Sequence, residues 1–194
     1  MANQPASSEQ TQYLGFHIAG EEYAIGILRV REILEYDTVT KVPTTPRSIR
    51  GVINLRGSVV PVIDLAVKFG LPESAITKRS CVVVVDAVVE GEGMVLGLLT
   101  DAVSQVIDLP PSEIEPPPSF GTRVRVECLL GMGRAGKKFV LLVDIDRLLS
   151  NDEVAAAQTV ADGDPASVLA EPAAIDAADA AEPTGNAAGA EGLL

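Results

Sequence analysis

The sequence predicts an all-β protein built from two small barrels. Short apolar runs, broken by Gly and Pro, recur at even spacing from residue 13 to residue 143, a pattern typical of barrels. These runs fall into two similar sets, near 13–64 and 80–143. The chain is 47% hydrophobic but only 4% aromatic and has no Trp, so we expect aliphatic side chains to fill the core.

The first set of runs predicts a series of short strands and helical segments before the midpoint of the chain. In order, we expect a strand at 13–18, a strand at 23–27, one helical turn at 27–29, a strand at 30–36, a short helix at 48–50 and a hairpin at 52–63. Pro61 has no N–H to donate, so its strand should lie at an edge or carry a bulge. Asp64 is a typical N-cap for a short helix that ends at Gly70.

The second set repeats this plan. We expect a strand at 81–85, a turn at 90–93, strands at 94–100 and 103–109, a hairpin within 127–143, and a short closing helix at 144–149 that Asp144 caps. Gly97, in the middle of a strand, indicates a close approach of another part of the chain.

The C-terminal segment differs sharply in composition from the rest. The whole chain has a net charge of −12, but residues 151–194 contain 9 Asp and Glu, no Lys or Arg, and 15 Ala. Residues 1–150 therefore carry 18 acidic and 15 basic side chains, a net charge of −3. We expect residues 151–194 to be a disordered tail, with at most one helical turn near Glu153 to Gln158, because large apolar residues are few.

No catalytic or metal-binding pattern is found in the sequence. His17 is the single histidine, and Cys81 and Cys128 are far apart, so neither a zinc site nor a Cys–His pair is indicated and free thiols are expected. No basic stripe suggests nucleic-acid binding, and no signal peptide or apolar run of membrane-spanning length is present. We expect a soluble cytoplasmic protein without cofactor, metal or enzymatic activity.

The hairpin at residues 51–65, with the sequence GVINLRGSVVPVIDL, holds an unusual residue at its tip. Gly57 supplies the positive φ that a tight turn needs, and Arg56 places a guanidinium beside it. From turn position alone, Arg56 is either a solvated turn residue or a contact presented to a partner.

This string resembles the signature of the CheW-type chemotaxis coupling proteins. Residues 22–33 resemble the opening segment of that family, residues 96–106 resemble its later strand pair, and the similarity runs from about Tyr13 to Ser150. The resemblance implies two packed SH3-like five-stranded β-barrels with a few short helices. We expect a flexible N-terminus (1–12), a CheW-like domain (13–150, with subdomains near 13–77 and 78–150) and the tail (151–194). Where the barrels exchange strands stays open.

The resemblance further implies a non-catalytic adaptor that bridges a chemoreceptor's cytoplasmic tip and the regulatory domain of a CheA-type histidine kinase. Such an adaptor is recruited to receptor arrays at the inner membrane, and we expect a monomer in isolation. Matching positions propose a receptor-binding groove formed by Ile27, Val30, Asn54, Arg56, Gly57, Val103 and Val106. We expect an ion pair between Glu32 and Arg56. Candidate kinase-binding residues are Val39, Thr40, Lys41, Val42 and Gly51.

Two alternatives remain. The chain has the features of an adaptor of the same fold in a non-flagellar circuit, such as surface motility or biofilm control, and the sequence does not separate the two. A regulatory-domain fragment of a larger kinase is the other alternative, although the chain contains no ATP-binding glycine motif.

Overall fold

The computed structural model describes residues 12–37, 39–43, 45–89, 91–117, 124, 126–136 and 138–162. The strands are β1 (Gln12–Ile18), β2 (Glu21–Gly26), β3 (Val30–Glu35), β4 (Ile49–Leu55), β5 (Ser58–Asp64), β6 (Cys81–Val89), β7 (Glu92–Thr100), β8 (Ala102–Asp108), β9 (Ile114–Glu115), β10 (Leu129–Ala135) and β11 (Lys138–Val143). The α-helices are α1 (Leu65–Lys68) and α2 (Asn151–Asp162), and the 3-10 helices are η1 (Ile27–Arg29), η2 (Pro111–Glu113), η3 (Val126–Cys128) and η4 (Ile145–Arg147).

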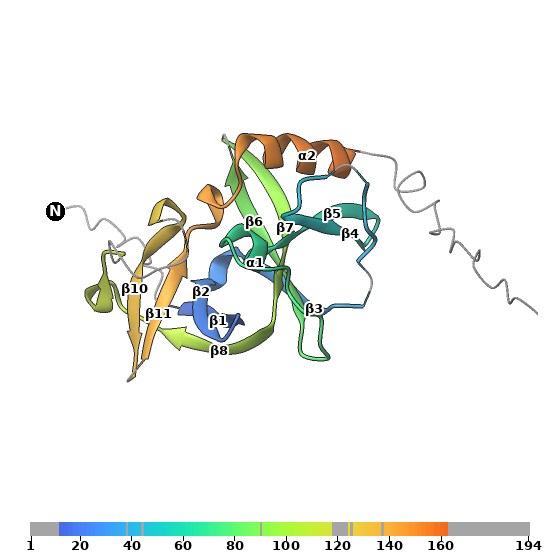
Figure 1. The fold of residues 1–194 in the computed structure, drawn as a ribbon. Helices are drawn as coiled ribbons and strands as arrows, with labels where there is room; N and C mark the ends of the chain where they lie inside the picture. The colour runs from blue at the N-terminus through green and yellow to red at the C-terminus, as the bar shows by residue number, and fades with distance from the viewer. Residues whose placement is uncertain are drawn as a thin grey trace, which may run out of the picture.

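The strands form two curled sheets, which confirms the predicted all-β class (Figure 1). The β1 sheet has the strand order β8-β1-β2-β11-β10-β9, and the β4 sheet has the order β3-β6-β7-β5-β4. The β4 sheet has the expected five strands, and the β1 sheet has a sixth because the two-residue strand β9 pairs with β10. In each sheet one hairpin joins the next by a parallel pairing, β2 with β11 and β5 with β7.

The two sheets are internal repeats of one plan. Ile49 pairs with Ile63 and Gly51 with Val62, separated by a register shift; Leu129 pairs with Val143 and Gly131 with Leu142, separated by the same shift. Hairpin β4–β5 is therefore equivalent, residue by residue, to hairpin β10–β11. Asp64, after β5, and Asp144, after β11, each accept a hydrogen bond from a backbone N–H two residues later.

The two halves of the chain exchange hairpins, a point that the sequence left open. The first hairpin, β1–β2, belongs to the sheet of β8 to β11, and the hairpin β6–β7 belongs to the sheet of β3 to β5. Sheet membership therefore does not follow the expected division near residue 77. Figure 1 shows β8 running beneath β1, far along the chain from it.

The core lies between the two sheets and contains side chains from both. Leu14 and Ile25 come from the β1 sheet, and Val83 and Leu98 come from the β4 sheet. The Phe16 ring stacks on Tyr23 with centroids 6.1 Å apart, and Tyr23 lies 5.0 Å from the Phe69 ring that follows α1. Three of the aromatic residues therefore lie together at the junction of the sheets, and each sheet also has a smaller apolar cluster of its own.

Two local expectations need correction. The short helix expected at 48–50 is wrong, because β4 begins at Ile49 after a single turn in which the Ile49 N–H donates to the Pro46 carbonyl at 2.8 Å. The strand with Pro61 is neither at an edge nor bulged at Pro61, since β5 lies between β4 and β7 and the register shift of the β4–β5 ladder falls between Ile49 and Gly51 of β4. Its pairing with β7 begins at Val62, so the missing N–H of Pro61 falls before that ladder starts.

Helix α2 corrects the prediction that residues 151–194 are disordered after at most one helical turn. It runs over residues 151–162 and packs on β5 and β4, at the top of Figure 1. Val154, Ala157 and Val160 are buried on one side of it. Residues 163–194 lie outside the described residues.

One half of a capping box begins α2. The Ser150 N–H and hydroxyl both donate to Glu153 Oε2 at 2.7 Å, so the Glu153 side chain reaches back over the first turn. The same carboxylate accepts hydrogen bonds from the Ser48 hydroxyl and the Lys68 ammonium, which belong to the β4 sheet side of the molecule. Burial alone raises the pKa of Glu153, but these hydrogen bonds outweigh it and lower the pKa to about 2. Glu153 therefore fastens α2 to the barrel.

Replacing Glu153 with Gln should make the unfolding free energy depend less on pH at acidic pH. The pKa of Glu153 in the folded protein lies below its ordinary value of 4.5, so the contribution of this carboxylate to stability is fully present above about pH 4.5 and is lost as pH falls toward 2. Between pH 7 and pH 3 the wild-type protein should lose roughly 2 kcal/mol more unfolding free energy than Glu153→Gln. Urea unfolding of both proteins at each pH measures this difference, and parallel pH profiles would contradict the proposed network.

Candidate functional site

The tip of hairpin β4–β5 is a tight two-residue turn. Leu55 pairs with Ser58, and the two residues between them, Arg56 and Gly57, have φ values of 52° and 91°. Positive φ at both central positions is the geometry of a type I′ turn, which matches the twist of the flanking strands. The Asn54 side-chain oxygen accepts the Gly57 N–H at 2.8 Å and holds the turn.

Arg56 occupies a backbone conformation that side chains other than Gly, Asn and Asp rarely adopt. Asn would fit this position with less strain, so the turn by itself does not favour an arginine. The Arg56 side chain is 82% exposed. The turn therefore presents a largely exposed guanidinium at its tip, in a backbone conformation that costs some strain.

Arg56 and Glu32 form an ion pair of 3.2 Å. Glu32 lies on β3 and Arg56 at the end of β4, which are the two outer strands of the β4 sheet, so the ion pair spans the gap across the curled sheet. Because the arginine is largely exposed, the pair contributes about 1 kcal/mol or less to stability. Its main effect is to orient the guanidinium.

The predicted apolar groove residues come from both sheets. Ile27 in η1, Val30 at the start of β3, and Val103 on β8 all pack, partly buried, against the central core. Val106, also on β8, is 49% exposed and pairs with Leu14 across the strands. We call these four residues the apolar strip.

Two exposed apolar residues close in sequence to Ile27 and Val30 were not among the predicted site residues. Leu28 in η1 is 74% exposed and Ile33 on β3 is 43% exposed. Both lie in the segment from 27 to 35 that already carries Ile27 and Val30. Alternation along β3 was the available signal, because Ile33 shares a face of the strand with the exposed residues Arg31 and Glu35.

A hollow of about 970 Å³ lies next to the hairpin tip. Residues 55–60 of the hairpin, residues 92–95 of β7 and Arg31 of β3 line it, and Gln158 and Ala161 of α2 form a further wall. Arg31 donates from Nε to Asp86 at 2.7 Å, and this carboxylate raises the pKa of Arg31. The contribution of α2 to this hollow was not foreseen, because that segment was expected to be disordered.

The candidate kinase-binding residues lie together along the outer edge of β4. Thr40 and Val52 exchange two backbone hydrogen bonds of 2.8 Å, which lay the segment from Val39 to Val42 against the strand. Gly51 has a φ of 152°, and a Cβ there would lie 2.2 Å from the Thr40 carbonyl oxygen. Lys41 is exposed, whereas Val42 packs on Val52 beneath α2.

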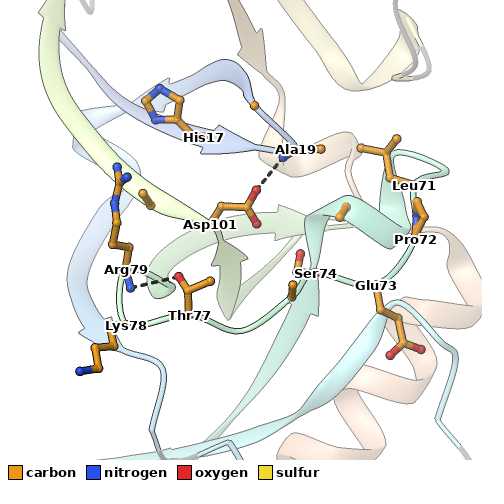
Figure 2. A pocket seen from close by; sticks show the side chains of 14 residues that line it. His17, Ala19, Leu71, Pro72, Glu73, Ser74, Thr77, Lys78, Arg79 and Asp101 are labelled. Carbon is orange, nitrogen blue, oxygen red and sulfur yellow. Dashed lines mark hydrogen bonds between the residues drawn. The ribbon is translucent and has the colours of Figure 1, made fainter.

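A second cavity, of about 810 Å³, lies between the β1 sheet and the loop that follows α1, and none of the predicted site residues line it (Figure 2). His17, Ala19 and Asp101 form one wall, and the loop from Leu71 to Arg79 forms the opposite wall. Asp101 accepts the Ala19 N–H at 2.6 Å. Nδ1 of His17 is buried without a hydrogen-bond partner among the described residues.

The described part of the chain contains no group of three His, Cys, Asp or Glu side chains placed to hold a metal ion. Cys81 and Cys128 are both free, as expected, with Cys128 buried and Cys81 partly buried. No helix among the described residues is long and apolar enough to span a membrane.

Comparison with known proteins gives one consistent family. A family model described as a CheW-like domain matches residues 12–153. The Chemotaxis protein CheW of Klebsiella aerogenes is 41% identical over 150 residues, which are 77% of this chain and 88% of that protein. The probable chemotaxis protein CheW of Rhizobium etli is 32% identical over 146 residues, 75% of this chain and 92% of that protein. Protein FrzA of Myxococcus xanthus is 30% identical over 142 residues, 72% of this chain and 86% of that protein.

The fold is also that of a solved relative. The crystal structure of the scaffolding protein TtCheW from Thermoanaerobacter tengcongensis superposes with a TM-score of 0.67 at 30% sequence identity. The match covers 79% of this chain and 96% of that chain. The family model ends at residue 153, so most of α2 lies beyond it.

Replacing Gly51 with Ala should destabilise the protein and release the segment from Val39 to Val42. The new Cβ would collide with the Thr40 carbonyl, and positive φ adds backbone strain, together costing about 2 kcal/mol or more. Gly93→Ala is the matched control, since a Cβ at Gly93 meets no atom within 4 Å. Thermal unfolding and hydrogen exchange at the Thr40 and Val52 amides measure the effect, and equal behaviour of the two variants would argue against the close contact.

Proposed function

We propose that this chain, which belongs to the family of CheW-like domains, is a non-catalytic adaptor that couples chemoreceptors to a CheA-type histidine kinase. Relatives named for chemotaxis and a structural neighbour titled a scaffolding protein support the adaptor role. The observation that carries the proposal is Arg56, held by Glu32 in a strained, exposed turn of the sequence segment that resembles the family signature. Function then consists of simultaneous binding on separate surfaces, and the proposal assigns no catalytic residue.

The receptor's cytoplasmic tip would bind at the apolar strip and the hairpin tip. Helical receptor tips can bury apolar side chains against Ile27, Val30, Val103 and Val106, a helix-in-groove mode driven by removal of apolar surface from water. Asn54, Arg56 and Gly57 would then supply polar contacts that orient the helix. Val103, partly buried in the core, contributes less free surface than Val106.

The kinase regulatory domain would bind along the outer edge of β4. The segment from Val39 to Val42 covers part of that edge, and Gly51 permits its close approach. Lys41 is exposed there and available to a partner. This surface is distinct from the apolar strip, so one adaptor can hold both partners.

The functional unit we propose is the CheW-like domain of residues 13–150, built from the two exchanged halves. It would act as a monomer in isolation and in the cytoplasm, and join arrays at the inner membrane through its receptor and kinase contacts. The N-terminal residues 1–12 and the segment after α2 have no assigned role in this proposal.

Arg56→Asn should fold normally and weaken binding of a receptor-tip peptide by roughly tenfold. Asn suits the positive φ of this turn, so the variant removes the guanidinium without straining the hairpin. Chemical-shift titration of the labelled protein with the peptide and, separately, with a CheA-type regulatory domain measures both affinities. Arg79→Asn, in an exposed loop away from the tip, is the matched control. If Arg56→Asn binds the peptide as tightly as the wild-type protein, the hairpin tip is not part of the receptor-binding site.

Val106→Ser should weaken binding of the same receptor-tip peptide by a similar factor of roughly ten, while leaving the stability of the fold nearly unchanged. Val106 is 49% exposed, so its loss removes contact surface rather than core packing. Val88→Ser, on β6 and 45% exposed, is a control of the same chemistry away from the strip. If both variants bind the peptide equally, the apolar strip is not the receptor site.

A further inference from the structure

The internal repeat gives the molecule two equivalent hairpin faces that are covered differently. On β4–β5, Val52 is 2% exposed and Val59 is 9% exposed, because Val160 of α2 packs on them. The equivalent residues on β10–β11 are Met132 and Phe139, since Val52 faces Pro61 and Asn54 faces Val59 as Met132 faces Leu141 and Arg134 faces Phe139.

This second face is open to water. Phe139 is 56% exposed, Met132 is partly exposed, and Leu130 at the neighbouring register shift is 55% exposed. The apolar side chains are also larger here than the two valines that α2 covers. Clustered large apolar residues on a surface usually mark an interaction site.

No helix from the described part of the chain lies over this face. After β11 the chain continues through η4 into α2, which crosses to β5 and β4. After β5, at the equivalent point of the repeat, the chain forms only the short α1 and then the loop from Leu71. Among the described residues, a helix therefore covers the β4–β5 face but not the equivalent β10–β11 face. Figure 1 shows α2 along the β4–β5 side of the molecule, away from the β10–β11 hairpin.

The charges around the open face indicate the chemistry of its occupant. The Arg134 guanidinium lies over the Phe139 ring, 5.8 Å from its centroid, and no carboxylate of the described residues forms an ion pair with it. Lys138 is exposed at the same end of the hairpin. Glu115 of β9, which pairs with Met132, provides one opposite charge at the far side. An occupant should therefore be apolar in the middle and acidic at the end that meets Arg134.

We propose that the face formed by Leu130, Met132, Arg134 and Phe139 docks an amphipathic helix of a partner protein, with an apolar stripe and acidic residues beside it. The helix would lie on β10–β11 as α2 lies on β4–β5. This contact is separate from the receptor and kinase surfaces proposed above and does not depend on them. The adaptor thereby gains a third binding surface.

A peptide of residues 149–162 of this chain is a suitable probe, because this helix already covers the equivalent face. It carries Val154, Ala157 and Val160 on one side and the acids Asp152 and Glu153 in its first turn. Titrated into the labelled full chain, it should give saturable shifts at Met132, Arg134 and Phe139. A peptide with Val160→Ser should bind much more weakly.

Substitutions in the full chain test whether the probe peptide binds at this face. Phe139→Ser should weaken binding of the probe peptide by roughly tenfold, and Arg134→Gln should weaken it by a few fold. Ile76→Ser, which changes a residue 40% exposed on a remote loop, should leave binding of the peptide unchanged. Several results would overturn the proposal: no saturable shifts at millimolar peptide, equal binding by Phe139→Ser, or shifts confined to β4 and β5. Concentration-dependent shifts at Phe139 without any peptide would also overturn it, by showing that a second copy of the chain covers the face.

Discussion

The exchange of hairpins between the two halves of the chain is the constraint on which the structure depends. Because β1–β2 completes the sheet of β8 to β11, and β6–β7 completes the sheet of β3 to β5, neither half can close its own barrel. The stack of Phe16, Tyr23 and Phe69 lies at the junction that this exchange creates. The exchange also leaves β3 and β8 as outer strands of different sheets, and these two strands carry three of the four apolar strip residues.

Stability and recognition rest on different kinds of contact in this molecule. The ion pair of Arg56 and Glu32 is exposed and adds little to stability, which agrees with the binding role that we propose for the hairpin tip. Glu153 is the opposite case, since its buried carboxylate is satisfied by Ser48, Lys68 and Ser150 and fastens a helix to the barrel. Under the proposed function, substitutions at the hairpin tip should affect partner binding, whereas substitutions at Glu153 should affect the stability of the fold.

Helix α2 shows where reasoning from composition failed. The many alanines and acids of residues 151–194, and their lack of aromatic residues, indicated disorder. The average composition of this segment concealed two local signals for a helix. Ser150 and Glu153 have the spacing of a capping box, and Val154, Ala157 and Val160 recur at helical spacing. Even so, a twelve-residue helix is marginal by itself in water, and its packing on Val52 and Val59 is what stabilises it.

The sequence by itself determined what depends on neighbouring residues. Alternation and turn chemistry predicted most strands, Gly57 and Asp64 predicted the tight turn and the helix cap, and the hairpin string identified the family and drew attention to Arg56. Only the tertiary structure decided which sheet each hairpin joins, why Pro61 is tolerated in a central strand, and that α2 covers one hairpin face while Phe139 stays open. These outcomes depend on contacts between residues far apart in the chain, and local periodicity carries no information about such partners.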